Sequence, residues 1–592
     1  MKKKSMISRG ALEEILVFST LFVVCLYLAA QLNFIGGKPR GAGVFASDKS
    51  IYYVYLPATF IYGWDVNKFP RHCDTIYKGF ILDYKTGKIV NKMTCGVALL
   101  WTPFFLVTHA IATVFNLHPD GFSDFYQEMA LIPPVFFLVL GLFFTKRFLR
   151  YYFPPPVVYT CLLFLLAGTN LFYYGLVEGL MSHVHSFFLF ALYLYLLKKF
   201  HGDPGRSLKL FAAISATVAL AILVRPTNLV ILAWFFLLDA ANLQEIAKRI
   251  RIFFRTEYLL TFALIVFLVF LPQLIYWKYV SGSFLHYSYG KEGFFYWKNP
   301  VILPLLFSPF NGLFLYNPMV LLFVAGASWM IFRRKANGLV LLFTFALVAW
   351  ISGSWHMWFF GGSFGSRPFV EYDAILSLGF GFFLAETARL KNLFTRSLVL
   401  LCMIIFSYYN LKLVYHNSWY TGSVWDWDAY KNRLEDASIL HFSKDSYTYI
   451  NDFENISFEP AIVISNVWYH SRNISGLVDS RYEYCGVYRR GMNAILDHPA
   501  GHITAGLWVS PVGSDSTDVV LVASIEDEQH HPWFYRIMPV NRSGTKTGTW
   551  SEVRLSFAIP HWLSEPEYTL KIYLWNVHHH TFYLDDVRVK IE

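Results

Sequence analysis

Long apolar runs alternate with short basic bridges over the first 416 residues. A helix needs about 17 to 25 apolar residues to cross a bilayer. Runs close to that length lie near residues 12–34, 97–115, 127–148, 155–173, 184–199, 207–224, 226–241, 257–279, 317–333, 338–354, 370–387 and 394–415. The pattern predicts a polytopic α-helical membrane protein.

The basic bridges indicate how these runs are oriented. Lys and Arg cluster between runs at 146–150, 198–209, 248–251, 333–335 and 389–396, and such clusters stay on the cytoplasmic side. All of them share one side with the basic N-terminus if the run at 97–115 lies along the membrane surface instead of crossing it. We therefore expect about eleven spanning helices, with the N-terminus inside and the C-terminus outside.

The same orientation predicts a long first outer loop, at residues 36–125. It contains two apolar segments that we expect to lie on the membrane surface, Ile51–Tyr62 and Val97–Phe115. Trp101, Pro103 and His109 interrupt the apolar character of the second segment, as is typical of an interfacial helix. Such a loop can form a roof over a cavity at the outer ends of the spanning helices.

The chain changes character after about residue 416. Apolar and polar residues alternate with a period of two at 502–510, 518–527, 552–560, 568–576 and 581–591, and turn-rich segments separate these stretches. That period indicates strands with one buried face. We expect residues 1–416 to form the membrane domain, 417–441 a linker, and 442–592 an all-β sandwich or jelly roll on the outer side.

Composition narrows the class of protein. Of 592 residues, 55% are hydrophobic and 15% are charged, which is far from the balance of a soluble globular protein. The net charge of +10 does not indicate nucleic acid, because the basic residues lie in the bridges rather than on one face with interleaved aromatics. No nucleotide-binding glycine loop follows a predicted strand.

Asp48 is the candidate catalytic residue. It lies where the first apolar run ends and the first surface segment begins, under the predicted roof. One interpretation is that its carboxylate only caps the following helix. The functional interpretation is a general base that orients and deprotonates an acceptor.

Two arginines are candidates for binding a phosphate. Arg225, in ILVRPTNLV, occupies a short outer turn between two apolar runs, where a cation goes against the orientation rule. Arg367, in WFFGGSFGSRPFVE, follows a glycine pair among aromatics. A snorkelling arginine is the plain alternative for Arg225, but a guanidinium beside a helix N-terminus suits a phosphate.

Several other ionisable residues map to the same outer side. They are further candidate cavity residues: Lys92, Glu128, Glu178, His183 and Glu371. Glu371 has the alternative role of satisfying a helix N-terminus. His183 and His185 match no strong zinc signature, so we assign no metal site and no cofactor. The sequence does not indicate a divalent cation, and the question of metal dependence stays open.

Short motifs occur in a characteristic order along residues 11–416: SDKSIYY, GVALLWTPFFLVTHA, DGFSDFYQE, RPTN, LLFSPFNGLFLYNP and WFFGGSFGSRPFVE. Together they resemble the GT-C glycosyltransferases, integral-membrane enzymes that use polyprenyl-phosphate sugars. The most similar subgroup is bacterial and related to protein O-mannosyltransferases and lipid A aminoarabinose transferase. The C-terminal region resembles carbohydrate-binding jelly rolls whose last strand carries a YLDDV-type sequence.

The resemblance implies transfer of a sugar from a polyprenyl-phosphate donor to an extracytoplasmic glycan, lipid or protein. It assigns acceptor activation to Asp48 and donor phosphate binding to Arg225 and Arg367. Protein O-mannosyltransferases carry Asp-Glu in this loop, whereas Lys49 follows Asp48 here, so the acceptor stays open. A single base with direct displacement implies inversion at the anomeric carbon.

Other functions and locations stay open at this level. A transporter or flippase of a lipid-linked glycan also needs a polar cavity among helices, although inverted halves are not evident; a non-catalytic glycan-binding scaffold is a third class. We expect the bacterial cytoplasmic membrane, with the site and the β-domain in the periplasm. Asn-X-Ser sequences at Asn455, Asn473 and Asn541 leave the endoplasmic reticulum as an alternative.

Overall fold

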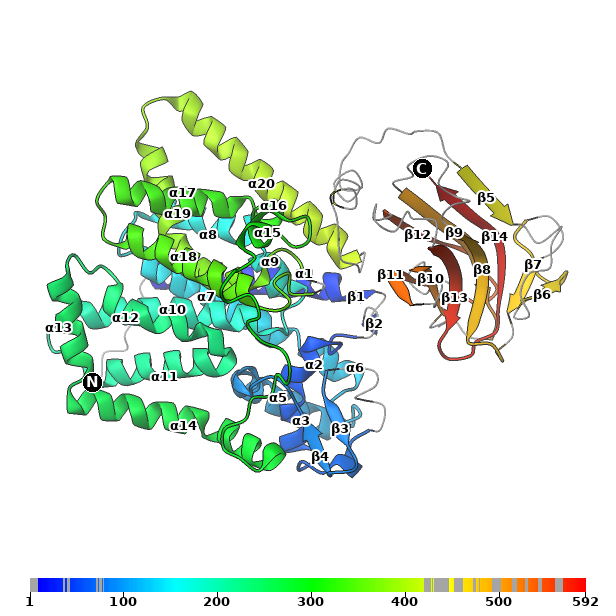
Figure 1. The fold of residues 1–592 in the computed structure, drawn as a ribbon, viewed down its shortest axis with the longest axis horizontal. Coiled ribbons are helices and arrows are strands. Elements are labelled where there is room, and N and C mark those ends of the chain that lie inside the picture. Colours follow the sequence, from blue (N-terminus) through cyan, green and yellow to red (C-terminus); the bar gives the residue numbers. More distant parts are fainter. Residues whose placement is uncertain are drawn as a thin grey trace. The chain divides into compact units, whose positions relative to one another are not determined.

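The computed structural model describes residues 9–35, 38–39, 43–70, 73, 77, 79–361, 363–419, 427, 430, 447–451, 462–471, 475–478, 480–491, 502–513, 519–527, 531–540, 546–558 and 568–591. They form two units, one of residues 1–307 and 311–411, the other of 308–310 and 412–592. The first is helical, and the second contains the end of the last helix, residues 412–419, followed by an all-β domain (Figure 1). Most of the predicted linker and the asparagines of all three Asn-X-Ser sequences lie outside the described residues.

The helical unit is built from α-helices with three short 3-10 helices. These are α1 (Arg9–Asn33), α2 (Asp48–Tyr53), α3 (Tyr55–Phe60), η1 (Val66–Lys68), α5 (Gly96–Val114), α6 (Asp124–Met129), α7 (Ile132–Leu149), α8 (Pro155–Gly168), α9 (Leu171–Leu176), α10 (Ser182–Gly202), α11 (Leu208–Val224), η2 (Pro226–Ala233), α12 (Trp234–Leu237), α13 (Leu243–Phe253), α14 (Thr256–Ser281), α15 (Ile302–Phe307), α16 (Leu313–Tyr316), α17 (Met319–Phe332), α18 (Asn337–Ser354), η3 (Arg367–Tyr372), α19 (Asp373–Arg389) and α20 (Leu393–Trp419). Two short hairpins are also present: β1 (Phe34–Ile35) pairs with β2 (Lys38–Pro39) directly after α1, and β3 (Ile81–Asp83) pairs with β4 (Lys88–Val90) in the first loop.

Seven stretches of the described residues are helical, long and apolar enough to cross a membrane. Shorter apolar helices cover 155–168, 208–224, 226–237 and 319–332. The fold class is therefore confirmed, while the count of eleven spans stays a prediction. The segment 96–114 also has membrane-crossing length and composition, so its placement along the surface stays a prediction too.

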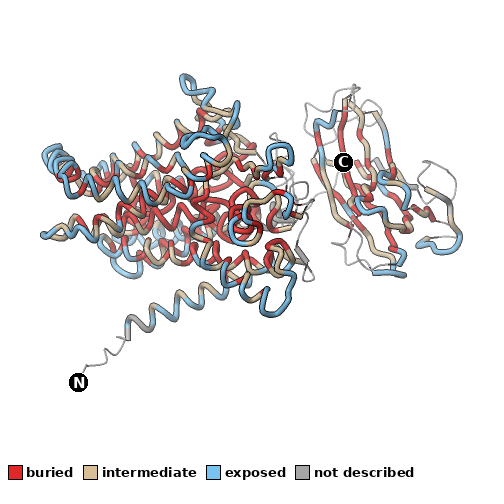
Figure 2. Tube along the Cα trace, turned by 90° about the horizontal axis from the view of Figure 1, so that it is seen from below, coloured by how far each residue is buried: buried red, intermediate tan, exposed pale blue. Residues whose placement is uncertain are grey.

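Burial separates central helices from peripheral ones. The residues of α10 and α19 are mostly buried. In contrast, the helix that starts near the N-terminus, α1, is coloured as intermediate or exposed along most of its length (Figure 2). Both α1 and α14 expose apolar side chains such as Leu16, Val23 and Leu260. Exposed apolar helix faces are what a lipid environment accommodates. Some of the polar residues described below lie on or next to these buried helices: His183 is on α10, and η3 leads directly into α19.

The first of the two apolar segments predicted in the first loop is divided into two helices, and its position on the membrane surface stays a prediction. The segment Ile51–Tyr62 forms two helices, α2 and α3, separated at Val54. Pro57 lies in α3 and has no amide hydrogen to donate to the carbonyl of Tyr53, which interrupts the helical ladder at this point. Aromatic stacking then holds the loop together, since the Phe45 and Tyr53 ring centroids are 3.9 Å apart.

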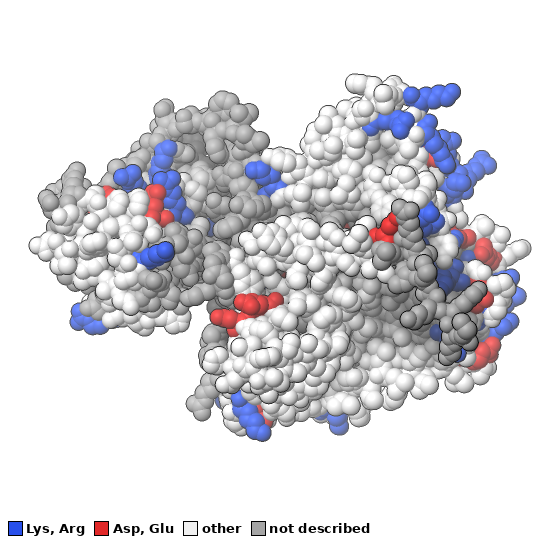
Figure 3. Space-filling view, turned by 180° about the vertical axis from the view of Figure 1, so that it is seen from behind, with Lys and Arg blue, Asp and Glu red and all other residues white. Residues whose placement is uncertain are grey.

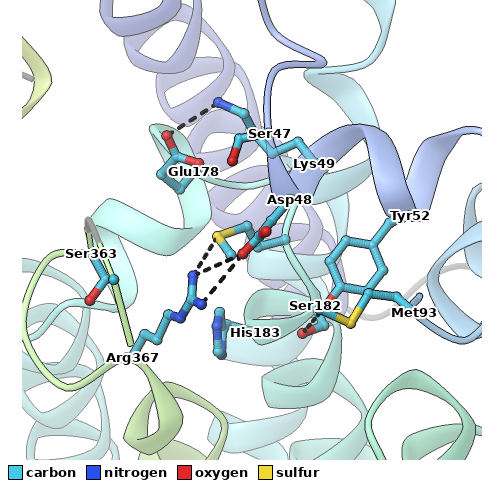
Figure 4. Close-up of polar contacts among 12 residues, drawn as sticks. Ser47, Asp48, Lys49, Tyr52, Met93, Glu178, Ser182, His183, Ser363 and Arg367 are labelled. Carbon is cyan, nitrogen blue, oxygen red and sulfur yellow. Dashed lines mark hydrogen bonds and ion pairs between the residues drawn. The ribbon is translucent and has the colours of Figure 1, made fainter. Parts of the chain in front are cut away.

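The ends of the helices fall into two sets. The start of α10 and η3, which leads into α19, lie at one end, which we call the Asp48 end because α2 begins there (Figure 4). The opposite ends of α10 and α19 carry Lys198 and Arg389. Because a helix of 20 residues is about 30 Å long, these two residues lie far from the Asp48 end. Lys and Arg gather at this opposite end of the helical unit (Figure 3), so the basic bridges and the candidate site are at opposite ends.

The second unit consists of two antiparallel sheets. One has the order β11-β10-β13-β8 and the other β12-β9-β14-β7-β6, with β5 pairing β14. The strands are β5 (Tyr447–Asn451), β6 (Ile462–Ser465), β7 (Ser475–Val478), β8 (Tyr484–Gly491), β9 (His502–Pro511), β10 (Val519–Glu526), β11 (Pro532–Pro539), β12 (Ser551–Ala558), β13 (Thr569–Asn576) and β14 (Phe582–Ile591). The five predicted strands match β9, β10, β12, β13 and β14, which confirms the all-β prediction.

The period of two sets the core of this unit. In β13, Leu570, Ile572 and Leu574 are buried while the residues between them are partly exposed. Leu574 pairs with Leu521 of β10 and with Cys485 of β8, and both partners are buried in the same hydrophobic core. The alternation therefore leaves Lys571, Tyr573 and Trp575 on the opposite face of the sheet.

Candidate active site

Asp48 is the first residue of α2, and its carboxylate faces Arg367. Both terminal nitrogens of Arg367 lie 3.4 Å from Oδ2 of Asp48, and the two side chains approach each other across the site in Figure 4. The Asp48 side chain is 37% exposed and that of Arg367 19%. The Asp48 carboxylate thus contacts a guanidinium that is far away in the sequence and is still open to solvent. Capping of α2 alone does not explain this contact.

The segment before Arg367 is held by side-chain amides and a tyrosine. Nδ2 of Asn311 donates to the carbonyls of Phe359 and Gly361 at 2.9 Å. The amide of Phe364 donates to the hydroxyl of Tyr174 at 3.1 Å. Gly365 has φ +61°, and a Cβ there would lie 2.5 Å from Nδ2 of Asn317. Only glycine fits this turn without strain, and the turn delivers Arg367 to the start of η3.

Arg225 belongs to a second, more buried cluster. It is the C-cap of α11 in an extended conformation. Its Nη1 lies 3.2 Å from Oε1 of Glu371 and 3.0 Å from Nδ1 of His183. Nδ1 of His183 is also 2.9 Å from Oε2 of Glu371. Because one ring nitrogen cannot accept from Arg225 and donate to Glu371 at once, the tautomer of His183 selects which bond forms.

The cluster around Arg225 is buried. The side chains of Glu371 and His183 are 1% and 2% exposed, and that of Arg225 is 19% exposed. A buried carboxylate needs a cation and hydrogen bonds to be stable, and Glu371 has both. The alternative that Glu371 only serves the N-terminus of α19 is incomplete, because its two oxygens contact Arg225 and His183.

One short element connects the two clusters. Arg367 and Glu371 are both on η3, so the residues that face Asp48 and Arg225 are four positions apart. Tyr52 of α2 lies in the same region, and its buried hydroxyl is 3.2 Å from Oγ of Ser182 (Figure 4). Burial raises the pKa of Tyr52, the charge of Asp48 raises it further, and Arg225 and Arg367 oppose the rise. Tyr52 is therefore within electrostatic range of both clusters.

The remaining candidates divide into paired and separate residues. Glu178 accepts from Lys49 at 3.2 Å, and Lys92 lies 2.6 Å from Glu292. Glu128 is exposed on α6, and among the described residues it contacts no member of the site. The sequence did not point to Tyr52 or Glu292. Both sit in aromatic segments, SIYYVYL and YGKEGFFYW, in which no local pattern singles them out.

Among the residues that the structure describes, no group of three or more His, Cys, Asp or Glu side chains is arranged to hold a metal ion. The nearest imidazoles have other partners. His183 is bound to Arg225 and Glu371, and His185 contacts Nε1 of Trp101 and the carbonyl of Met181.

No protein-family model and no curated protein matches the chain, but solved structures do. ArnT from Cupriavidus metallidurans bound to undecaprenyl phosphate is 13% identical, covering 69% of this chain and 70% of its own, with a TM-score of 0.38. The Archaeoglobus fulgidus oligosaccharyltransferase is 13% identical over 69% of this chain and 56% of its own, with a TM-score of 0.39.

A different set of structures matches a shorter share of the chain. The family 22 carbohydrate-binding module of Clostridium thermocellum Xyn10B is 16% identical, covering 24% of this chain and 92% of its own, with a TM-score of 0.19. Both kinds of protein that the sequence resembles are thus among its structural neighbours. At these identities and TM-scores no function carries over, so function rests on the residues of this chain.

Proposed function

We propose that this protein is a membrane glycosyltransferase that transfers a sugar from a polyprenyl-phosphate donor to an acceptor at the Asp48 end. One observation carries the proposal. A partly exposed carboxylate lies 3.4 Å from one guanidinium, and the same short helix η3 holds the carboxylate that anchors a second guanidinium. A base and two phosphate-binding cations are what transfer from a phosphate-linked sugar requires.

The chemistry assigns a role to each group. Asp48 accepts the proton of the acceptor hydroxyl or amine as that atom attacks the anomeric carbon. Arg225 and Arg367 hydrogen-bond the phosphate oxygens and stabilise the charge that develops as the bond to the sugar breaks. Because a single attack from the opposite face displaces the phosphate, we propose inversion at the anomeric carbon.

Arg225 is proposed as the fixed phosphate anchor. Its contacts with buried Glu371 and His183 use Nη1 alone, so its other nitrogens are the donors proposed for a phosphate. Holding the guanidinium in place before the donor arrives lowers the entropic cost of binding. Glu178 and Lys92 are proposed to line the mouth of the site as parts of their ion pairs.

The arrangement of charge supports a proposal for the side of the membrane on which the site lies. The basic bridges and the site occupy opposite ends of the central helices, and the bridges are expected in the cytoplasm. We therefore propose a bacterial cytoplasmic membrane protein whose site and β-unit face the periplasm. The acceptor is a glycan, a lipid or a protein.

The β-unit is proposed to bind glycan. On the face of the sheet opposite its core, the rings of Tyr484 and Trp575 are nearly parallel with centroids 6.2 Å apart, and Tyr573 lies 6.0 Å from Tyr484. Lys571 and Glu526 form an ion pair at 2.5 Å beside them. Aromatic faces next to charged hydrogen-bonding groups suit a sugar ring.

A direct assay tests the main proposal. Purified protein is incubated with polyprenyl-phosphate sugars and candidate acceptors, and the release of polyprenyl phosphate is followed. Transfer predicts release that depends on the acceptor and on Asp48. A flippase instead predicts movement of an intact donor across proteoliposomes without release, and that result would replace the proposal.

A further inference from the structure

The charged side chains of the site are balanced in pairs. Arg367 faces Asp48, Arg225 faces Glu371, Lys49 faces Glu178, and Lys92 faces Glu292. A phosphate that enters therefore meets a site whose cations already have anionic partners. A cation binds the phosphate more strongly when its own carboxylate is neutralised or released, because the carboxylate and the phosphate compete for the same hydrogen-bond donors.

The two arginine pairs differ in how firmly they are held. Glu371 is 1% exposed, and His183 at 2.9 Å supports it. Asp48 is 37% exposed and offers one oxygen to Arg367 at 3.4 Å. Long contacts near solvent hold weakly, because water competes for both partners. The Asp48–Arg367 pair is thus the one that can exchange.

The other contacts of Arg367 are weak. Its Nη1 lies 3.8 Å from Sδ of Met181, and its Cζ lies 5.8 Å from the ring centroid of Phe360. Its Nε is buried without a hydrogen-bond partner. Within the described residues Asp48 is the one carboxylate in contact with this guanidinium, so the loss of the Asp48 charge leaves Arg367 with unused hydrogen-bond donors.

The proposed reaction changes charge at two places at once. The donor phosphodiester carries one negative charge. Attack by the acceptor oxygen or nitrogen forms its bond to the anomeric carbon and breaks the bond between that carbon and the phosphate oxygen, which keeps the electron pair. The leaving polyprenyl phosphate monoester then carries a second negative charge, and the acceptor proton moves to Asp48.

We propose that Arg367 transfers its hydrogen bonds from Asp48 to the leaving phosphate in this step. Protonation removes the charge that holds the guanidinium, just as the phosphate gains the charge that attracts it. The inference rests on the proposed function and adds a sequence of events to it. Arg225 holds the phosphate throughout, while Arg367 responds to the proton.

Neighbouring charges leave this exchange intact. Asp48 is next to Lys49, but Lys49 contacts Glu178 at 3.2 Å. From the packed elements, His183 of α10 belongs to the Arg225 cluster, and Tyr52 of α2 is near Ser182. Arg367 of η3 is therefore the cation that the charge of Asp48 controls.

The test is binding of the product, measured with a short-chain polyprenyl phosphate and the full chain in detergent. Asp48→Asn removes the charge that occupies Arg367, so we expect about tenfold tighter binding, the scale of one charge-assisted hydrogen bond. Asp124→Asn is the matched control, because Asp124 is an exposed residue of the same first loop. It makes the same chemical change away from Arg367 and is expected to leave binding unchanged.

A double variant locates the effect. In Asp48→Asn/Arg367→Gln we expect the gain to disappear. Arg367→Gln alone should weaken binding of the product more than binding of the donor, whereas Arg225→Gln should weaken both. Unchanged or weaker binding by Asp48→Asn, or a gain that persists without Arg367, would overturn the proposal. If Asp48→Asn does not fold, Asp48→Ser removes the same charge, and we expect the same gain in affinity for the short-chain polyprenyl phosphate.

The same measurements distinguish failure of the glycosyltransferase proposal from failure of the exchange alone. If the wild-type protein binds no polyprenyl phosphate and releases none, the glycosyltransferase proposal and the exchange both fail. If the wild type binds product and turns over but Asp48→Asn shows no gain, the enzyme stands and the exchange alone is wrong.

Discussion

Replacing Glu371 with glutamine tests whether the buried charge cluster holds the helical unit together. The substitution keeps the shape of the side chain and removes its charge beside Arg225 and His183. Removing one partner of a buried ion pair costs about 3–5 kcal/mol. The amide oxygen can still accept the bond from Arg225 at about half the strength of a charged one, so we expect Glu371→Gln to cost about 2 kcal/mol.

Glu178→Gln is the matched control. It makes the same change at the same end of the unit, but the side chain of Glu178 is 27% exposed, against 1% for Glu371. Water reaches this pair better than the Glu371 cluster, so we expect a smaller cost of about 1 kcal/mol, the upper end of the range for exposed pairs. The measurement is the midpoint temperature of thermal unfolding in detergent, monitored by tryptophan fluorescence. We expect a clear fall for Glu371→Gln and a smaller one for Glu178→Gln. Equal midpoints for both variants would refute the reasoning that burial makes the Glu371 charge important.

Three further substitutions test the site and the β-unit. Asp48→Asn is expected to lower transfer about 100- to 10,000-fold, the range of a general base, with the unfolding midpoint within a few degrees of wild type; transfer at the wild-type rate would remove Asp48 as the base. Gly365→Ala places a methyl group against Asn317 at positive φ, so we expect about 1–3 kcal/mol of destabilisation and loss of transfer. Thermal unfolding and the transfer assay measure the two effects. Unchanged stability and transfer would contradict the argument that only glycine fits this turn. Trp575→Ala is expected to weaken glycan binding by the β-unit, measured in a glycan array, and to leave unchanged the release of polyprenyl phosphate during transfer to a small acceptor. Unchanged glycan binding would show that Trp575 does not contact the glycan.

Most elements of the fold were predictable because they depend on local spacing. The predicted run 12–34 corresponds to α1, 338–354 to α18 and 257–279 to α14, since apolar length is read directly from consecutive residues. The strands of the β-unit follow from a period of two in the same way. The run 226–241 departs from its prediction: it begins as the 3-10 helix η2 and ends as the short α12. Hydropathy measures length and polarity but not helix type.

The candidate site was predictable as a set of residues and not as a set of contacts. Orientation by the basic bridges placed Asp48, Arg225, Arg367 and Glu371 at one membrane face, because charge near helix ends is a local property. Glu128 shared that placement but is exposed and separate from the site. The orientation of the helices predicts which residues share one membrane face, and the packing of the helices decides which of those residues are in contact.

The sequence by itself determined the order of helices and strands, the change of character near residue 416 and the expected membrane face of the polar residues. Each of these depends on neighbours within one turn, one strand or one span. Only the tertiary structure decided that Asp48 pairs with a residue 319 positions away and that Arg225 shares a carboxylate with His183. Such pairings depend on how helices pack around η3, and no local spacing along the chain contains that information.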